Sequence, residues 1–543
     1  MRRYRIVSSS SDEANNNSKT LGNELNDHSL EEEDFESNLE SDDGDNEWKK
    51  ITGRQLGINE YAEEEEFLIH NMDCDDPVSL YKLFVTDHIL EIITEETNKY
   101  ATQCINNSTC SSTHHQRAWK PVTKDEINAF FGILLIMGII QIPEIRLYWS
   151  QNDIYANARI KNAMKRDRFI SILKYLHFSD NTTARVEDRL QKIRNVLEAI
   201  VHTFKTSVKP GKNIVIDESM IPWRGRLSFR QYIPGKRHKY GIKAYKLCLP
   251  EGYTYNIEIY AGKNAEPIAK THSHDVVIKL IRDLLFEGRT LFTDSFYTSI
   301  PLAEELMQKK TFICGTIKKN KKFLPPQSKQ KQVRGSIMSF ENRSGVKFMK
   351  WTDKRPVCMI TTSQNHKCTI IQGPNNKSKP DTVFFYNNVK KGVDLSDQMS
   401  SYYSSLRRTV KWYRKIVIEI ICGTCLVNAW YIHKKWGTKN IPILKFREQI
   451  IDHLLIKDHS REIEEAEIEK RSKSRKRTHF LQSFKGASRN TRKRCKECYK
   501  QFSKIRGRLY AAKKSKKVTT YCTRCKGHPA LCLECFKKLH RYK

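Results

Sequence analysis

The chain has 543 residues, of which 38% are hydrophobic, so it is long enough to bury a core in two or more domains and is not a small stapled peptide. A formal net charge of +34 favours a polyanionic partner such as nucleic acid, although charge alone does not separate DNA from RNA. Fifteen cysteines, in a chain whose first residues show no apolar signal segment, indicate reduced thiols and metal ligation inside the cell.

The two ends of the chain differ sharply in charge. Residues 1–75 are rich in Asp, Glu, Ser and Asn with few large apolar side chains, which predicts a disordered acidic arm. Residues 471–543 instead contain 25 Lys and Arg and only two acidic residues. Most of the non-specific DNA affinity is therefore expected in this basic tail.

Residues 76–212 are predicted to be helical, because apolar residues such as Leu80, Leu83 and Phe84 recur at spacings of three and four. The longest apolar run of the chain, Ala129–Ile140, is shorter than the ~20 residues that a membrane-spanning helix needs. We therefore expect a buried core helix there and no membrane partner.

From residue 213 the pattern changes to short β-branched and aromatic runs with helical segments between them. The expected strands are Ile214–Ile216, Tyr255–Tyr260, Leu291–Thr293 and Thr311–Ile317, and the expected helices are Asp275–Phe286, Pro301–Lys309 and Val393 to about His433. This alternation indicates an α/β layer with a mixed sheet. Residues 318–380 are polar and broken by prolines, which predicts an insertion or a long flexible excursion.

Four aspartates stand out as candidate metal ligands. Asp217 and Asp294 each follow an expected strand, whereas Asp394 and Asp397 are three apart at the start of an expected helix and share one of its faces. Two-metal phosphodiester chemistry needs carboxylates that hold two Mg²⁺ ions about 3.5 to 4 Å apart. Each aspartate alone is weak evidence, since a strand-end aspartate is more commonly a turn residue or a helix cap.

Three sequence blocks around these aspartates closely resemble the piggyBac family of transposases. The blocks are Ile216-Asp217-Glu218 with Pro222-Trp223-Arg224-Gly225-Arg226 and Lys239-Tyr240-Gly241-Ile242-Lys243; Thr293-Asp294-Ser295-Phe296-Tyr297-Thr298-Ser299; and Gly392-Val393-Asp394-Leu395-Ser396-Asp397-Gln398-Met399 with Arg407-Arg408-Thr409-Val410-Lys411-Trp412. Upstream, Tyr148-Trp149, Met164 to Phe169 and Asp188-Arg189-Leu190 also fit, so the resemblance runs from about residue 78 onward.

The resemblance implies a multidomain α/β protein with an RNase H-like catalytic core. Its expected parts are a helical dimerisation and DNA-binding domain (76–212 and 401–457), the catalytic domain (213–400, with an insertion at about 318–380), a basic linker (458–490) and a cysteine-rich zinc-binding domain (491–543). Asp217, Asp294 and Asp394 would be the catalytic residues that bind two Mg²⁺ ions, and Asp397 the accompanying fourth acid.

The same resemblance implies a homodimeric nuclear enzyme that excises a transposon through hairpin intermediates and inserts it at TTAA. Double-stranded DNA, in the form of terminal inverted repeats and the TTAA target, would be its partner. Two alternatives remain open: a domesticated, non-catalytic DNA- or chromatin-binding protein, and an unrelated zinc-containing nuclease acting on RNA.

Six cysteines in three CxxC pairs lie in the last 49 residues, a spacing typical of structural zinc sites. With two histidines they give eight candidate ligands, enough for one zinc or for two interleaved zincs: Cys495, Cys498, Cys522, Cys525, His528, Cys532, Cys535 and His540. Metal binding is expected to fold this basic segment, and the resemblance assigns it the recognition of terminal repeats.

Basic and aromatic residues near the catalytic blocks are candidate DNA contacts. They are Arg224, Arg226, Lys239, Arg407, Arg408, Lys411, Trp412 and Arg414. Trp412 is equally well interpreted as a core anchor. Arg471 to Arg477 has the composition of a nuclear import signal, which would engage the import machinery.

Overall fold

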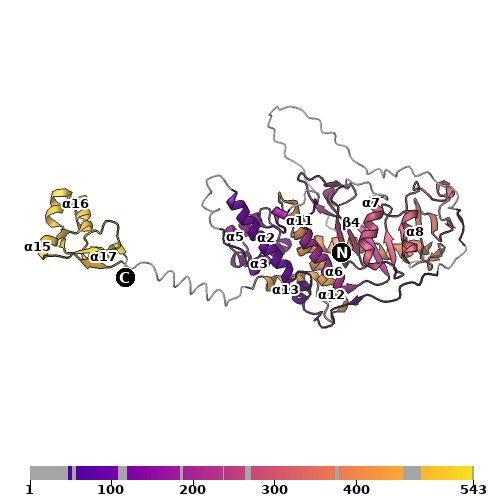
Figure 1. The fold of residues 1–543 in the computed structure, drawn as a ribbon, viewed down its shortest axis with the longest axis horizontal. Helices are drawn as coiled ribbons and strands as arrows, with labels where there is room; N and C mark the ends of the chain where they lie inside the picture. The colour runs from indigo at the N-terminus through magenta and orange to yellow at the C-terminus, as the bar shows by residue number, and fades with distance from the viewer. Residues whose placement is uncertain are drawn as a thin grey trace, which may run out of the picture. The chain divides into compact units, whose positions relative to one another are not determined.

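The computed structural model describes residues 47–51, 57–107, 119–183, 188–236, 238–262, 271–373, 378–456 and 479–540 (Figure 1). The chain divides into two compact units, residues 1–456 and 457–543. The predicted nuclear import signal and most of the predicted basic linker lie outside the described residues.

The first unit is built on a mixed sheet whose centre has the strand order β7-β6-β4-β8-β9. β4, β6 and β7 are antiparallel neighbours, whereas β8 runs parallel to both β4 and β9. These strands are Asn213–Pro222 (β4), Tyr240–Cys248 (β6), Thr254–Ile259 (β7), Thr290–Thr293 (β8) and Phe312–Thr316 (β9). The mixed sheet expected from the sequence is therefore confirmed.

The segment predicted as an insertion or a flexible excursion joins this sheet. β12 pairs with β9, and β11 and β10 follow in an antiparallel meander with Lys49–Lys50 (β1) at the far edge. The bounds are Ile337–Glu341 (β10), Lys347–Thr352 (β11) and Pro356–Thr361 (β12). Gln231–Tyr232 (β5) extends β6 at the other edge, and Ile370–Gln372 (β13) pairs with Ser378–Pro380 (β14). The flexible-excursion interpretation is thus wrong for residues 337–361, which form an ordered extension of the sheet.

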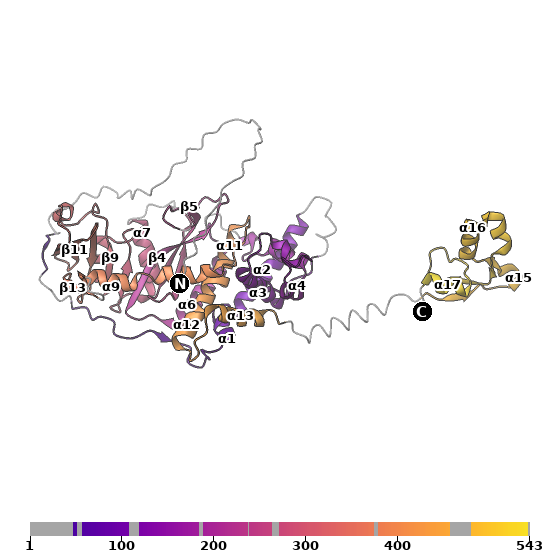
Figure 2. The same ribbon diagram turned by 180° about the vertical axis from the view of Figure 1, so that it is seen from behind.

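Helices cover both faces of the sheet (Figure 1 and Figure 2). On one face, Ile214 and Ile216 share a core with His272–Ile281 (α7) and Ile300–Gln308 (α8). On the other, Val215 and Phe292 pack with Asp381–Val389 (α9). Because strand side chains alternate between faces, this pattern fixes which face each later β4 residue occupies.

A helical region flanks the sheet and is assembled from two distant parts of the sequence. Its first part comprises Pro77–Phe84 (α1), Asp87–Asn106 (α2), Lys124–Ile139 (α3), Ala158–Ala163 (α4), Arg166–Tyr175 (α5) and Arg194–Ser207 (α6). Its second part comprises Trp412–Glu419 (α11), Cys425–Trp436 (α12) and Ile443–Leu454 (α13). α1 packs against α12 and α13, and α3 against α13, as the adjacent indigo and orange ribbons show in Figure 2.

The apolar run Ala129–Ile140, predicted to be a buried core helix, lies in α3 and confirms that prediction. α3 begins with a capping box in which Thr123 and Glu126 exchange hydrogen bonds, and its residues from Phe130 to Gly138 are buried. A second long apolar helix runs from Trp412 to Trp436 through a π-helical turn at Ile420–Thr424 (η7). It is long and apolar enough to cross a membrane, but 89% of its apolar window is buried inside the protein, as in a core helix.

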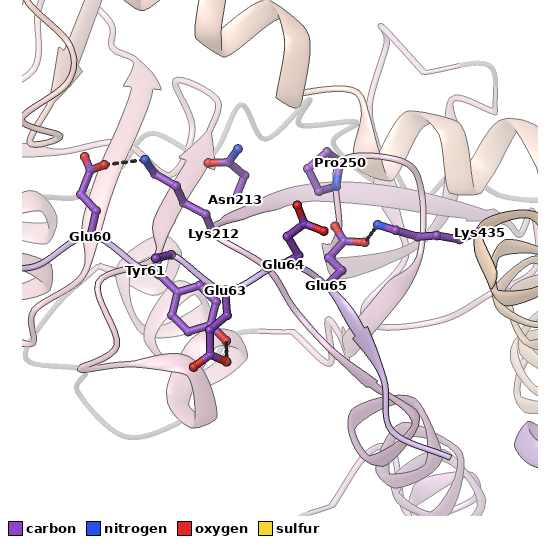
Figure 3. A pocket seen from close by; sticks show the side chains of 11 residues that line it. Glu60, Tyr61, Glu63, Glu64, Glu65, Lys212, Asn213, Pro250 and Lys435 are labelled. Atoms are coloured by element: carbon purple, nitrogen blue, oxygen red, sulfur yellow. Dashed lines mark hydrogen bonds and ion pairs between the residues drawn. The ribbon is translucent and has the colours of Figure 1, made fainter. Parts of the chain in front are cut away.

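Part of the predicted acidic arm is ordered. Residues 57–75, called the strap below, run along the first unit, and Glu66–Phe67 (β2) pairs with Val208–Lys209 (β3). Figure 3 shows the hydrogen bonds and ion pairs that join Glu60 to Lys212 and Glu65 to Lys435. The prediction of disorder up to residue 75 is therefore wrong for the strap, which is held both by ion pairs and by the buried Phe67.

The second unit is a small module with a sulfur-rich core in which Leu531 and Phe536 pack among the cysteines. Its elements are Leu481–Ser483 (β15), Ser488–Thr491 (α15), Lys493–Arg494 (β16), Lys496–Lys514 (α16), Lys517–Val518 (β17), Thr520–Cys522 (β18) and Leu533–His540 (α17). β15 pairs with β18 and β16 with β17.

Candidate active site and metal centres

Asp217 and Asp294 come together at the centre of the sheet. Ile216 of β4 lies beside Thr293 of β8, so the two aspartates are the next residues on neighbouring parallel strands. Both share a face with Val215 and Phe292, the face that α9 covers. Asp217 does not end its strand, as the sequence suggested, since β4 continues to Pro222; it lies where its parallel neighbour β8 stops.

The next helix, α10 (Gly392–Tyr402), brings Asp394 and Asp397 to the same region. α10 packs against β4 and β6, and its first residue must be small. A Cβ on Gly392 would lie 2.4 Å from the carbonyl oxygen of Leu249, closer than any real contact. Asp394 is exposed in the first turn, whereas Asp397 is partly buried against β4 and β6.

Burial makes the carboxyl groups of Asp217 and Asp294 costly to ionise in this setting. Burial raises the pKa of Asp217 to about 8, with Glu218 and Asp294 adding to the rise. Burial and Glu218 also raise the pKa of Asp294. Asp217, which holds its proton near neutral pH, would gain from a bound cation, and burial acts in the same direction on Asp294, so these donors fit a divalent metal ion.

Glu218 and Lys236 belong to this site although the sequence did not single them out. The Lys236 Nζ donates to the main-chain oxygen of Glu218 at 2.8 Å and lies 3.4 Å from its Oε1. Burial alone would raise the pKa of Glu218, but the nearby Lys236 and Lys243 lower it overall. Burial alone would lower the pKa of Lys236, but the nearby Asp217, Glu218 and Asp394 raise it overall. The Lys236 ammonium therefore lies among the acids as a counter-charge. Lys236 lies in an irregular loop between two parts of the first block, after Arg226 and before Lys239, and belongs to neither of them.

Asp397 is held by two side chains of the sheet. Ser219 Oγ and Lys246 Nζ each lie 2.8 Å from Asp397 Oδ1. Lys246 is only 5% exposed, whereas the Asp397 side chain is 35% exposed, so the ion pair is buried on the lysine side. Asp397 thus has one oxygen committed to the protein.

The arrangement of the acids is looser than that of the cysteine sites. Within the part of the chain that the structure describes, only two groups of three or more His, Cys, Asp or Glu place their ligand atoms within 4.8 Å of one another, and both are in the second unit. The sheet and α10 bring Asp217, Asp294, Asp394 and Asp397 to one region without gathering them around one point.

The first group in the second unit contains four cysteines, Cys495, Cys498, Cys532 and Cys535. The Sγ atom of Cys532 lies 3.8 Å from those of Cys495 and Cys498, and Cys498 Sγ lies 3.5 Å from Cys535 Sγ. Zn–S bonds of about 2.3 Å in a tetrahedron require sulfur atoms about 3.8 Å apart. The group therefore fits a structural zinc ion.

The second group contains Cys522, Cys525, His540 and His479. Cys522 Sγ lies 3.4 Å both from His479 Nδ1 and from His540 Nε2, whereas Cys525 Sγ lies 3.6 Å and 3.5 Å from the same atoms. A tetrahedral zinc with two sulfur and two nitrogen ligands requires about 3.6 Å between them. Along the chain, the two groups alternate, so they form interleaved sites.

His528 is the one predicted zinc ligand that the structure leaves out of both groups. Its backbone is left-handed, with φ of 42°, and its ring lies edge-on to Tyr521. His479 takes the place expected for it. His479 precedes the first CxxC pair by sixteen residues, outside the usual spacing of a knuckle, so the cysteine motif does not predict it.

The predicted DNA contacts separate into exposed and structural residues. Arg224, Arg226, Lys239 and Arg408 are exposed, and Lys411 is partly buried. Arg414 is buried, and its guanidinium donates to the carbonyl oxygens of Leu176 and Lys174 at 2.9 and 2.6 Å, so the structure contradicts its assignment to DNA.

Two further predicted contacts also pack within the protein. Arg407 donates to the main-chain oxygens of Ser404 and Leu406 and to the Tyr148 hydroxyl. Trp412 is partly buried, with its ring edge-on to the buried Phe229 at 5.2 Å. These contacts favour the core-anchor interpretation of Trp412.

Comparison with known proteins assigns the family. A family model described as Transposase IS4 matches residues 76–430, which is more than half of the chain. The chain belongs to the piggyBac-type transposase family. Two human relatives are PiggyBac transposable element-derived protein 3, 27% identical over 401 residues, and protein 2, 25% identical over 393 residues.

The likeness to piggyBac transposases extends to three dimensions. The alignments cover 70% and 69% of this chain but 65% and 64% of the human proteins 3 and 2. The cryo-EM structure of a piggyBac transposase synaptic complex with hairpin DNA superimposes with a TM-score of 0.65 at 25% identity, covering 87% of this chain and 97% of that one.

Proposed function

We propose that this protein is a cut-and-paste DNA transposase that cleaves and joins DNA strands with two Mg²⁺ ions. The observation that carries the proposal is the pair Asp217 and Asp294 on adjacent parallel strands, with Asp394 and Asp397 brought to them by α10. Membership of the piggyBac-type family supports it. Excision through hairpins and insertion at TTAA are the steps that the family resemblance implies.

We infer that the catalytic domain has an RNase H-like core. Three antiparallel strands followed by two parallel strands, in the order β7-β6-β4-β8-β9, support this assignment. In such a core the first aspartate lies on the central strand and the second follows its parallel neighbour, which is how Asp217 and Asp294 are arranged.

Asp217, Asp294 and Asp394 would hold the metal ions, and Asp397 would support them. When bound, the metals activate the attacking oxygen and stabilise the leaving one. The protein supplies carboxylates whose mutual repulsion a cation relieves, while Lys236 balances their charge. Exposed cations such as Arg224, Arg226 and Lys239 flank this region and could hold DNA phosphates in place.

We further propose double-stranded DNA ends as the partner, a homodimer as the working form and the nucleus as its location. The solved relative is a synaptic complex with hairpin DNA, which supports a DNA partner. The basic second unit, folded on two zinc ions, would read the terminal repeats. A dimer follows from the need to hold two transposon ends together.

The experiment is an excision assay with purified protein, Mg²⁺ and a plasmid carrying the flanking repeats of the gene. Asp294→Asn should abolish strand cleavage, by about 10³-fold or more, while retaining DNA binding in a gel-shift assay. Asp353→Asn is the matched control, because Asp353 is a half-exposed residue whose ion pair, to Arg334 at 3.6 Å, lies away from the four aspartates in the sequence. Normal cleavage by Asp294→Asn would refute the active-site assignment.

The second candidate is a domesticated DNA-binding protein without catalysis. The human relatives named as derived from transposable elements keep this candidate open. The two proposals differ in one result: the domesticated protein would bind DNA but leave every candidate end uncut in Mg²⁺ or Mn²⁺.

A further inference from the structure

Two exposed tyrosines lie side by side on the hairpin that β5 forms with the start of β6. The antiparallel register sets Tyr232 directly opposite Tyr240, so both side chains lie on the same face. Their ring centroids are 4.7 Å apart with the planes tilted by 43°, and the residues are 46% and 43% exposed. Among the described residues, no other pair of aromatic rings in contact has both members exposed.

The turn of this hairpin is anchored beside the proposed metal site. Ile233 N donates to Lys239 O at 2.8 Å, and Lys236 N donates to Ile233 O at 3.3 Å. The Lys236 side chain then donates to the main-chain oxygen of Glu218, the residue after Asp217, at 2.8 Å. Each tyrosine is four residues from Lys236, at most about 14 Å of extended chain. The ring pair therefore lies within a few nucleotides of the metal site along a bound strand.

The surroundings of the two rings are strongly cationic. The Arg230 guanidinium lies over the Tyr240 ring, 5.2 Å from its centroid, and donates to the main-chain oxygen of Arg224 at 3.3 Å. Arg224 and Lys239 are themselves exposed. Residues 219–250 contain eight Lys and Arg and no Asp or Glu. This surface therefore favours a flat ligand that carries negative charge.

An unpaired base with its phosphate is the ligand that matches these features. Aromatic rings and guanidinium planes within a cationic surface bind single-stranded nucleic acid, because every base has a flat face and every nucleotide a charge. In a duplex both faces of a base are buried in the stack, so such rings reach a base only where the strand is opened. A tyrosine pair of this kind also stabilises its own hairpin by cross-strand packing, and the test below separates the two roles.

We propose that Tyr232, Tyr240 and Arg230 form a stacking platform for an unpaired base of the DNA strand held at the metal site. The inference rests on the proposed function, to which it adds a substrate that is unpaired beside the cleaved bond. The rings hold the base, and the neighbouring cations hold its phosphate. Stacking of this kind keeps an opened strand in place while its phosphate is cleaved or joined.

The test measures binding of the full chain to two fluorescent DNA probes, without added divalent metal so that no cleavage intervenes. One probe is a hairpin oligonucleotide with an unpaired loop, and the other is the blunt duplex of the same stem. We expect Tyr232→Leu and Tyr240→Leu each to weaken binding of the looped probe about tenfold and to leave binding of the blunt duplex unchanged. Tyr232→Phe and Tyr240→Phe are the matched controls: they keep the rings and should bind both probes as the wild type does.

Photo-cross-linking of the wild type makes the test independent of how the variants fold. With iodouracil in the loop, we expect mass spectrometry to find the DNA attached to Tyr232 or Tyr240. Cross-links confined to other residues would overturn the inference. So would wild-type affinity of both leucine variants for the looped probe, which would leave the pair as a brace of the hairpin or a contact for a protein, and so would equal weakening on both probes. If the wild type cross-links at these tyrosines but cleaves no DNA end in Mg²⁺, the platform stands and the proposed function fails.

Discussion

The imidazoles of His177 and His366 are buried, and each finds hydrogen-bond partners. His177 contacts the Tyr413 hydroxyl and Asn181 at 3.2 and 3.1 Å, and His366 contacts Thr361 at 2.8 Å. Burial lowers the pKa of each to about 4. Both rings are thus neutral in the folded protein at a pH where they would be charged in the unfolded chain.

This lowering predicts acid sensitivity. A histidine with a depressed folded pKa contributes stability that is present above its unfolded pKa of about 6.5 and is lost as the pH falls toward 4. We expect each histidine to cost up to about 2 kcal/mol at pH 5 relative to pH 7. Urea unfolding of His177→Gln and of the wild type at both values measures this, and an unchanged pH difference in the variant would contradict it.

Two histidine variants test which residues bind zinc. The structure places His479 in the second group, whereas the sequence motif predicted His528. His479→Ala should lower the zinc content from about two ions per chain to about one, since a tetrahedral site loses a ligand. His528→Ala should leave both ions bound, because its ring lies outside both groups. Zinc content by mass spectrometry of the purified chain decides, and loss of zinc in His528→Ala would restore the motif assignment.

At the scale of elements, the position of α10 depends on the close packing of Gly392, its first residue, against the carbonyl group of Leu249. Gly392→Ala would push the first turn of α10 from the Leu249 carbonyl and displace Asp394 and Asp397. We expect a loss of about 1 to 3 kcal/mol in the free energy of unfolding, accompanied by loss of cleavage. Gln398→Ala, on the exposed side of the same helix, is the matched control. Equal stability of the two variants in urea would disprove the packing argument.

How far the elements could be predicted depends on what stabilises them. β4, β8 and α3 bury apolar runs, so pattern and motif found them, together with the four aspartates that they position. β10 and β11 were missed because their polar residues, such as Lys347 and Lys350, are satisfied by carbonyl oxygens far along the chain. Lys236 and His479 were missed for a similar reason, since only the fold brings them to their sites.

At the scale of the whole first unit, the strap joins the sheet to the helical region. Figure 3 shows Glu60 paired with Lys212 beside the sheet and Glu65 paired with Lys435 on α12. Glu60 also bonds Ser363 and Asn365, and Glu65 bonds Tyr431. Composition alone could not predict that the strap is ordered, because the charged residues that hold it lie far from it in the sequence.

The strap therefore predicts a salt-dependent stability. Glu65→Gln, at a side chain only 12% exposed, should lower the free energy of unfolding by about 1 to 3 kcal/mol at low salt. Glu63→Gln is the matched control and should have a much smaller effect, since its pair with Lys209 is 64% exposed on the Glu63 side. Urea unfolding at low and high NaCl measures both. Equal effects of the two variants would show that the strap does not tie the halves together.

Because the helical region is built from two distant parts of the sequence, its first part is synthesised long before its second part. The apolar side of α1, formed by Leu80, Tyr81 and Phe84, emerges from the ribosome more than three hundred residues before α12 and α13, the helices that cover it. A product that stops between Asp397 and Trp412 carries Asp217, Asp294 and Asp394 yet lacks both α12 and α13, so part of that apolar side stays uncovered. Truncated copies of such a gene would thus yield aggregating chains for chaperones and proteases to clear, not stray nucleases.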